Sequence, residues 1–148
     1  MLTFSYGKSK KLGEVKNFPH LTIRTSIIGQ SKNKNNLINS ILSNLKVQGY
    51  SKYIWNGVTS LECSKFIYFC IKKKLAGVCH LSSIKISKFK LLNIIKDIYN
   101  IKKLTIIKEQ KKSFKRCLKK LRRDYTYNVP THKKMIKDLF VFERKFFR

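Results

Sequence analysis

The chain has 148 residues, a length that suits one domain with a modest core plus a tail. Its 34 lysine and arginine residues outnumber its 7 aspartate and glutamate residues, which gives a formal net charge of +27. Hydrophobic residues make up 43% of the chain, which excludes a purely solvated polybasic segment. A charge excess of this size repels itself, so we expect a polyanionic partner.

Residues 1–18 are polar and lysine-rich, and we expect them to form a mobile arm. They contain no apolar stretch of the kind that a secretory signal needs. No run in the chain approaches the roughly 18 apolar residues of a membrane-spanning helix. We therefore expect a cytoplasmic or nuclear protein, and a mitochondrial location stays open because the first acidic residue is Glu14.

Apolar and polar residues alternate at about 20–28, which predicts a strand that Gly29 ends. A basic loop follows at 30–35. Helical spacing of apolar residues from Leu37 onward predicts a first helix. The β-favouring run at 53–55 then predicts a short strand.

A second helix is predicted at about 59–75, where apolar residues again recur at helical spacing. Three consecutive lysines, 72–74, close it, where they either complement the helix dipole as solvated side chains or contact phosphates. Tyr68 and Phe69 widen its apolar face beyond one stripe. We therefore expect a dimer, homo- or heteromeric, through the surface near this helix.

Strands are predicted at about 78–87 and 104–107, while 88–100 suits either a helix or a long hairpin arm. Apolar residues at helical spacing among many basic ones predict a basic amphipathic helix over 111–123. Arginine binds phosphate through two parallel hydrogen bonds, so we expect this helix to contact nucleic acid. Tyr125 and Tyr127, which follow it, are candidates for stacking on unpaired RNA bases. A last helix is predicted at about 131–146.

The four cysteines form no CxxC pair, and Cys79-His80 is adjacent to no second ligand pair, so we expect reduced thiols and no metal site. The seven acids are too scattered in sequence to suggest a carboxylate cluster, and no glycine-rich phosphate-binding motif appears. We therefore expect no catalytic residue and no cofactor. Two alternatives stay open: a nuclease in which the fold unites two of the three histidines, and a membrane-surface role for 111–123.

The predicted order β-α-β-α-β-β, with a basic loop after the first strand, resembles the Alba family, including the Alba-like subunits of RNase P and RNase MRP. Residues 29–38, 53–57 and 71–81 carry the likeness, which covers about 19–108. The family often has two glycines in the turn before the second helix, and here only Gly57 is present. The resemblance implies a dimer of small domains that grips DNA or RNA through basic loops.

We therefore predict an α+β fold with a basic arm at 1–18, a small Alba-like domain at 19–108 and a basic helical C-terminal extension at 109–148. The predicted function is nucleic-acid binding, to RNA more than to DNA, as a dimer or as a ribonucleoprotein subunit. The alternative is a structural ribosomal protein, including an organellar one. We expect no membrane partner and no enzymatic activity. The predicted nucleic-acid contacts are Lys32, Lys34, Lys72, Lys73, Lys74, Arg116, Lys119, Lys120, Arg122 and Arg123.

Overall fold

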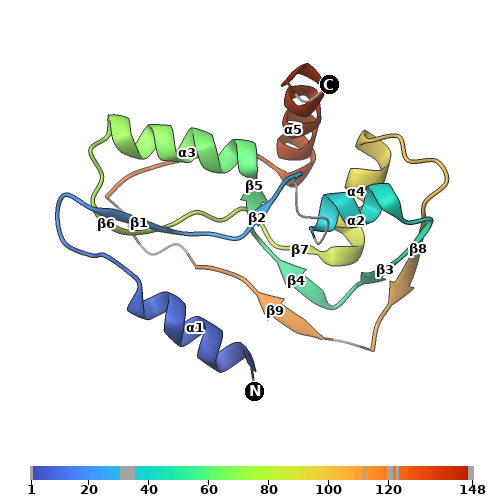
Figure 1. The fold of residues 1–148 in the computed structure, drawn as a ribbon, viewed down its shortest axis with the longest axis horizontal. Helices are drawn as coiled ribbons and strands as arrows, with labels where there is room; N and C mark the ends of the chain where they lie inside the picture. The colour runs from blue at the N-terminus through green and yellow to red at the C-terminus, as the bar shows by residue number, and fades with distance from the viewer. Residues whose placement is uncertain (1, 31–35, 112, 120–121, 123, 147–148) are drawn as a thin grey trace.

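A computed structural model describes residues 2–30, 36–111, 113–119, 122 and 124–146, with only the backbone described for 2–6 and 116. Short strands alternate with helices along the chain (Figure 1). The helices are α1 (Leu2–Leu12), α2 (Leu37–Ser43), α3 (Ser60–Lys72), α4 (Lys88–Ile98) and α5 (His132–Phe146). The strands are β1 (Leu21–Arg24), β2 (Ile27–Ile28), β3 (Lys46–Tyr50), β4 (Tyr53–Trp55), β5 (Val58–Thr59), β6 (Gly77–His80), β7 (Ile86–Ser87), β8 (Thr105–Glu109) and β9 (Phe114–Arg116).

Side-chain caps fix where three of these helices begin. Asn36, Thr59 and Ser87 each precede a helix with extended backbone, and each side-chain oxygen accepts a hydrogen bond from the N–H three residues later. Such caps satisfy backbone donors that have no partner inside the helix. The helix predicted at 59–75 is confirmed as α3, and the ambiguous segment 88–100 is a helix, α4.

Parallel pairing dominates the sheets. β1 pairs with β6, β2 with β5, β3 with β8 and β4 with β9, all in parallel, and among the described residues only the pairing of β4 with β7 is antiparallel. Parallel partners need long crossover connections, which here run through the helices. The predicted Alba-like β-α-β-α-β-β domain is therefore wrong. The alternation of apolar and polar residues along a strand indicates which of its faces is buried. It does not identify the strand with which it pairs, because that strand lies far away in the sequence.

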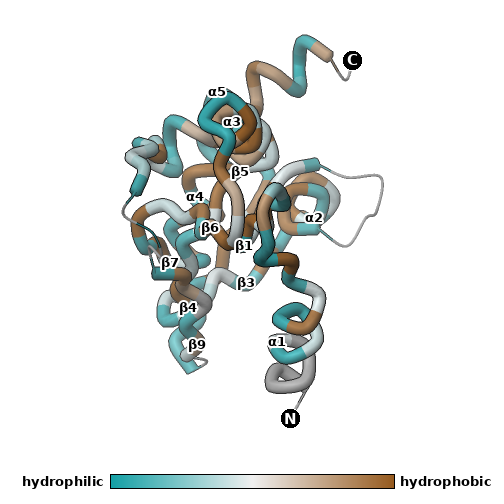
Figure 2. The backbone as a smooth tube through the Cα atoms, turned by 90° about the vertical axis from the view of Figure 1, so that its left-hand side faces the viewer, coloured by the Kyte–Doolittle hydropathy of each residue, from teal (hydrophilic) through white to brown (hydrophobic). Residues whose placement is uncertain are grey.

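Two hydrophobic clusters form the core. One lies where α4 packs against β3 and β8, and includes Trp55, Leu92 and Ile95. The other lies beneath α3 and includes Phe66 and Cys79. Figure 2 shows these apolar stretches gathered in the body of the molecule, with α1 standing apart at one end.

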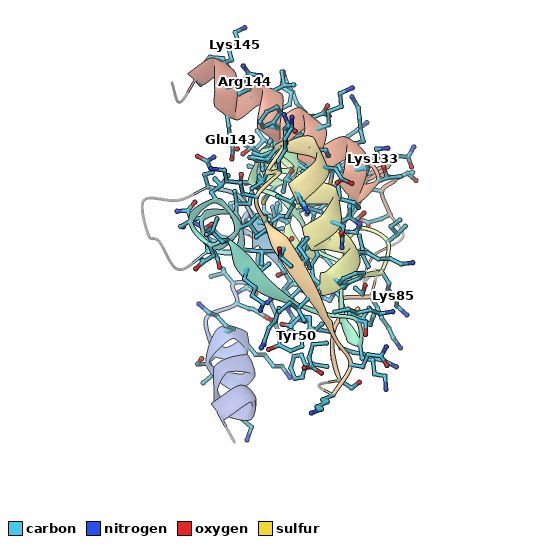
Figure 3. All side chains as sticks on the ribbon, turned by 90° about the vertical axis from the view of Figure 1, so that its right-hand side faces the viewer. Tyr50, Lys85, Lys133, Glu143, Arg144 and Lys145 are labelled. Carbon is cyan, nitrogen blue, oxygen red and sulfur yellow. The ribbon has the colours of Figure 1, made fainter. Side chains whose placement is uncertain are left out.

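Helix α5 joins the two clusters, because Ile136 is buried in the first and Met135 in the second. Its buried Glu143 accepts hydrogen bonds from the Tyr99 hydroxyl at 2.6 Å and from the Gln30 backbone N–H at 3.3 Å. Figure 3 shows Glu143 on α5 beside Arg144 and Lys145. The last helix predicted at 131–146 is confirmed, and its packing makes it part of the core.

The basic helix predicted at 111–123 is wrong, because part of this segment forms strand β9 and the described remainder is irregular. Phe114 stacks on Tyr53 with ring centroids 5.5 Å apart. The Asn56 side chain donates to the Leu118 carbonyl at 2.8 Å and accepts from the Leu118 N–H at 3.0 Å. These contacts, together with repulsion between basic residues four apart, override the helical spacing.

The N-terminal segment also differs from the expectation of a mobile arm, since residues 2–12 form α1. The division into an arm, a domain and an extension stays a prediction. Within the described ranges, no helix is long and apolar enough to cross a membrane.

His132, at the start of α5, is the buried group from which we expect a pH effect. The residue is 2% exposed, and its ring lies 5.5 Å from the Trp55 ring, centroid to centroid. Burial lowers the pKa of His132, and a smaller interaction with the Gly57 backbone raises it. The pKa of His132 is therefore lower in the folded protein than in the unfolded chain. As the pH falls, the unfolded chain binds the proton first.

The free energy of unfolding should therefore be constant above the ordinary histidine value of about 6.5 and decrease below it. The slope for one proton is at most about 1.4 kcal/mol per pH unit. Urea unfolding between pH 5 and 7.5 measures it. His132→Gln should flatten the profile, whereas His20→Gln, at an exposed position, should leave it unchanged. A wild-type profile that is flat across this range would contradict the assignment.

Candidate functional site

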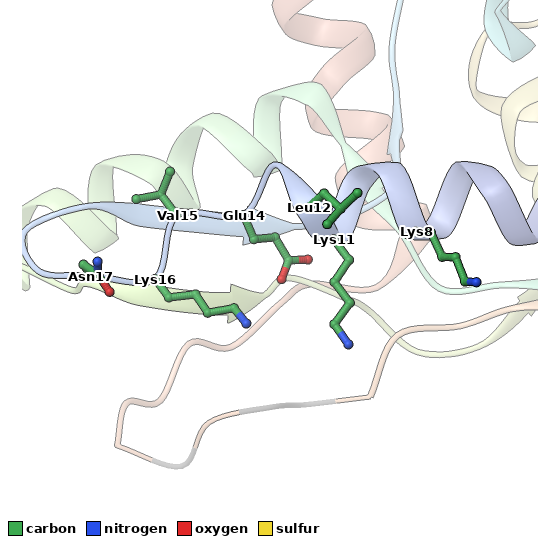
Figure 4. Close-up of a pocket in the computed structure, with 7 residues that line it drawn as sticks. All are labelled: Lys8, Lys11, Leu12, Glu14, Val15, Lys16 and Asn17. Atoms are coloured by element: carbon green, nitrogen blue, oxygen red, sulfur yellow. The ribbon is translucent and has the colours of Figure 1, made fainter.

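An open cleft of about 720 Å³ runs along the end of α1 and the loop after it (Figure 4). Its lining is Lys8, Lys11, Leu12, Glu14, Val15, Lys16 and Asn17. The one acidic side chain among these, Glu14, is neutralised by Arg24 of β1. The cleft therefore carries a net positive charge and suits an anionic ligand.

The loop after α1 is fixed to β1 by three side chains. The Arg24 guanidinium donates two hydrogen bonds to the Glu14 carboxylate, each at 2.6 Å. These bonds hold the pKa of Glu14 below its ordinary value and raise that of Arg24. The Thr22 hydroxyl accepts from the Val15 N–H at 3.1 Å and donates to the Val15 carbonyl at 2.9 Å. The cleft wall is thereby positioned by the sheet.

Arg24 and His80 stand opposite each other at the carboxyl ends of β1 and β6. Arg24 Nη1 lies 3.2 Å from His80 Nε2, and His80 Nδ1 lies 2.7 Å from the Lys119 carbonyl oxygen. Since a guanidinium only donates and a carbonyl only accepts, Nδ1 carries the proton and Nε2 accepts. In α/β sheets ligands bind beyond the carboxyl ends of parallel strands, which is where this cluster lies.

Tyr6 and Lys10 lie one turn apart in α1, at positions that share a face of that helix. A tyrosine hydroxyl can donate a proton, and an ammonium group nearby stabilises the phenolate that remains. The polar, lysine-rich composition of residues 1–18 predicts an arm and therefore hides this pair. The four-residue spacing of a tyrosine and a lysine was the available signal.

The predicted nucleic-acid contacts do not form one surface around this cleft. Lys72, Lys73 and Lys74 are exposed at the end of α3, and Lys72 Nζ lies 5.5 Å from the Tyr68 ring centroid. Arg116 belongs to β9, and the Lys119 carbonyl contacts His80. Lys32, Lys34, Lys120 and Arg123 lie outside the described residues.

Arg122 makes contacts within the chain. Its guanidinium forms an ion pair with Asp124, donates to the Ala76 carbonyl and lies 3.5 Å from Cys79 Sγ. The hydrogen bond from Arg122 lowers the pKa of Asp124. Arg122 therefore fastens the segment after β9 to β6. Arg122 thus lies beside Ala76, two residues after Lys74, and its guanidinium is occupied by partners within the chain.

No protein-family model matches the sequence, and no curated protein matches it. Solved structures do share its Rossmann-like α/β fold, and they include a dTDP-4-dehydrorhamnose reductase in complex with NADP and a dTDP-glucose 4,6-dehydratase in complex with NAD. The dTDP-4-dehydrorhamnose reductase of Bacillus anthracis, in complex with NADP, superimposes with a TM-score of 0.73 at 17% identity. That match covers 93% of this chain and 52% of the reductase.

Two further solved structures share the fold of this chain. A dTDP-4-dehydrorhamnose reductase of Clostridium acetobutylicum gives a TM-score of 0.64 at 12% identity over 84% of this chain and 49% of its own. A GDP-L-fucose synthetase of Naegleria fowleri gives 0.61 at 14% identity over 98% of this chain and 51% of its own. The chain thus spans about half the length of the structures it matches. At these identities the likeness establishes the fold alone.

This fold corrects the sequence-based interpretation. The resemblance to the Alba family is wrong, because the structures that match are Rossmann-like enzymes with parallel strands. Three further predictions are overturned with it. They are the nucleic-acid-binding or ribosomal function, the nucleic-acid partner with the expected dimer, and the absence of enzymatic activity. The net charge of +27 predicts an anionic partner, but it does not distinguish a nucleic acid from a smaller phosphate-bearing ligand. The predicted cellular compartment stays a prediction.

Proposed function

We propose that this chain supplies the proton donor of an NADP-dependent reductase that acts on the carbonyl group of a nucleotide sugar. The observation that carries the proposal is the fold likeness over 93% of the chain to a dTDP-4-dehydrorhamnose reductase in complex with NADP. The same enzyme class recurs in matches from other organisms, which supports the assignment.

Tyr6 and Lys10 provide the chemistry that such a reaction requires. Reduction of a carbonyl group adds a hydride to the carbon and a proton to the oxygen. In this proposal Tyr6 gives its hydroxyl proton to the carbonyl oxygen, and the Lys10 ammonium stabilises the resulting phenolate. Their spacing in α1 supports this division of roles.

The cleft beside α1 supports an anionic substrate. A nucleotide sugar carries a diphosphate, and Lys8, Lys11 and Lys16 all line the cleft. Lysine binds phosphate as a point charge, which attracts this group without fixing its orientation. Two of these lysines, Lys8 and Lys11, belong to α1, the helix that also carries Tyr6 and Lys10.

The residues of this chain do not fit the pyrophosphate of NADP. In Rossmann-like folds that group sits on a G-x-G-x-x-G turn at a helix N-terminus, and the sequence contains no such motif. Gly57 precedes α3 in the chain, and Gly29 packs against the first residue of that helix. Neither glycine leaves room for a phosphate. The Ser60 hydroxyl fills the space beside Gly29, and the Ser26 carbonyl and Trp55 ring fill that beside Gly57.

A turnover measurement tests the proposal. The chain is fused to the part of the Bacillus anthracis reductase that it does not match, and product formation from a dTDP-4-dehydro sugar with NADPH is followed. We expect turnover that depends on both compounds, and none when the chain is assayed alone. A fusion that folds and joins its halves yet forms no reduced sugar would contradict the proposed function.

A further inference from the structure

The buried face of α5 continues into a part of the helix that the rest of the described protein does not cover. Met135 and Leu139 are buried in this face, and Phe142 and Phe146 follow them after about two helical turns. Yet Phe142 is 37% exposed and Phe146 is 59% exposed, and their ring centroids lie 4.7 Å apart. The core-facing stripe therefore ends in a pair of aromatic rings at the surface, on residues 140–146, which we call the α5 tip.

Cations lie over aromatic rings of the α5 tip. The Arg144 guanidinium lies 5.5 Å from the centroid of the Phe140 ring. The Lys145 ammonium lies 5.3 Å from the centroid of the Phe146 ring. Glu143, the one acidic residue of the tip, is buried and hydrogen-bonded within the chain. The exposed surface of the tip therefore combines apolar side chains with positive charge.

The α5 tip is also hollowed and stands apart from the cleft. Phe140, Val141, Arg144 and Lys145 line an open groove of about 450 Å³. Figures 1 and 2 show the C-terminal end of α5 projecting from the body of the molecule, on the side away from α1. Figure 3 shows Arg144 and Lys145 at that end. A partner that contacts the tip therefore leaves the cleft beside α1 open.

Charge complementarity selects the partner. A second copy of the chain would bring two positive tips together, and these repel each other. The surface of an anionic bilayer offers negative charge next to a hydrocarbon layer. Aromatic side chains bind at that boundary, while lysine and arginine keep their apolar stems beside them and their charges among the headgroups. Each basic residue near an anionic leaflet adds to the attraction, and the net charge of +27 extends it over a longer range.

We propose that the α5 tip binds the surface of membranes that contain anionic lipids. The rings of Phe142 and Phe146 enter the boundary between headgroups and acyl chains, and Arg144 and Lys145 contact the lipid phosphates. This binding is independent of the proposed function, because no residue of the tip lines the cleft beside α1.

Vesicle flotation of the purified chain tests the proposal. We expect binding to phosphatidylcholine vesicles that contain phosphatidylserine, at least tenfold weaker binding to phosphatidylcholine alone, and a decrease as salt is added. Phe142→Ser/Phe146→Ser should weaken binding to the anionic vesicles at least tenfold. The matched double variant Leu42→Ser/Leu45→Ser, at exposed apolar positions elsewhere, should bind like the wild type.

The charge at the tip needs its own control, since a chain this basic is attracted to any anionic vesicle. Arg144→Gln/Lys145→Gln should weaken binding at least tenfold, because both charges lie at the lipid surface. Lys102→Gln/Lys103→Gln, at exposed positions and with the same change in net charge, should weaken binding less than twofold.

A tryptophan in place of Phe146 reports insertion directly, and it decides the matter if Phe142→Ser/Phe146→Ser does not fold. Lipids with brominated acyl chains should quench the fluorescence of Phe146→Trp but not that of the buried Trp55 in the wild type. Absence of quenching, equal effects of the two charge variants, or wild-type binding by Phe142→Ser/Phe146→Ser would overturn the proposal. So would a dimer in light scattering that Phe142→Ser/Phe146→Ser dissociates, because the tip would then be a contact between copies.

Discussion

Replacing Tyr6 by phenylalanine should lower the turnover of the fused polypeptide by about 10²- to 10⁴-fold, the usual contribution of a general acid. The substitution removes one hydroxyl and leaves the helical position filled. Lys10→Met should also lower turnover, because it removes the charge that stabilises the phenolate. The Michaelis constant for the sugar should change little in Tyr6→Phe, since the proton is transferred only in the transition state.

Tyr68→Phe is the matched control for this substitution. Tyr68 also lies on a helix, α3, and is exposed away from the cleft. Turnover of Tyr68→Phe should equal that of the wild type. If Tyr6→Phe retains wild-type turnover, the proton comes from another group and the assignment of Tyr6 is wrong. The pH profile of turnover would then identify the titration of the true donor.

Phe66→Ala should lower the free energy of unfolding by about 3–5 kcal/mol, the largest stability effect that we expect from one substitution. Phe66 is 1% exposed and lies at the centre of an aromatic cluster with Phe69, Tyr125 and Tyr127. Its removal leaves a cavity that α3 and the segment before α5 cannot readily fill. Chemical denaturation of the purified chain measures the change.

Ile71→Ala serves as the control in the same helix. Ile71 is exposed near the end of α3, so its truncation should change the free energy of unfolding by no more than about 0.5 kcal/mol. A loss below about 1 kcal/mol in Phe66→Ala would show that Tyr125 and Tyr127 do not pack on α3 in solution.

The elements with strong local signals were predictable from the sequence. The apolar face of α3 begins at a threonine cap, and α5 carries its buried residues at helical spacing. The partners of the strands were not predictable, because β1 and β6 are brought together by contacts between residues about 56 apart. That distance places α2 and α3 between them, and no local pattern records it.

Aromatic residues were misassigned for a related reason. Tyr125 and Tyr127 were expected to stack on RNA bases, and Phe69 to help form a dimer surface. The structure packs all three together with Phe66, and the Tyr127 hydroxyl donates to the buried Glu62 carboxylate at 2.6 Å. A sequence shows that such residues need burial, but the surface that buries them depends on the fold.

The cleft beside α1 was not predictable from the charge pattern, because basic residues are spread along the whole chain. The lysines that line the cleft, Lys8, Lys11 and Lys16, lie in the part that was set aside as an arm. The emphasis on 111–123 rested on a helix that does not form. The excess of lysine over acidic residues is also found in the lining of the cleft, where Glu14 is the one acidic side chain.

The most direct test of the central claim follows a label from cofactor to sugar. The fused polypeptide is incubated with a dTDP-4-dehydro sugar and NADPH that carries deuterium at its transferable position, and the product is analysed by mass spectrometry. The account predicts a reduced sugar nucleotide that carries the deuterium, formed at a rate that Tyr6→Phe lowers at least 100-fold. An unlabelled or unreduced sugar, formed by a fused polypeptide that is folded, would contradict it.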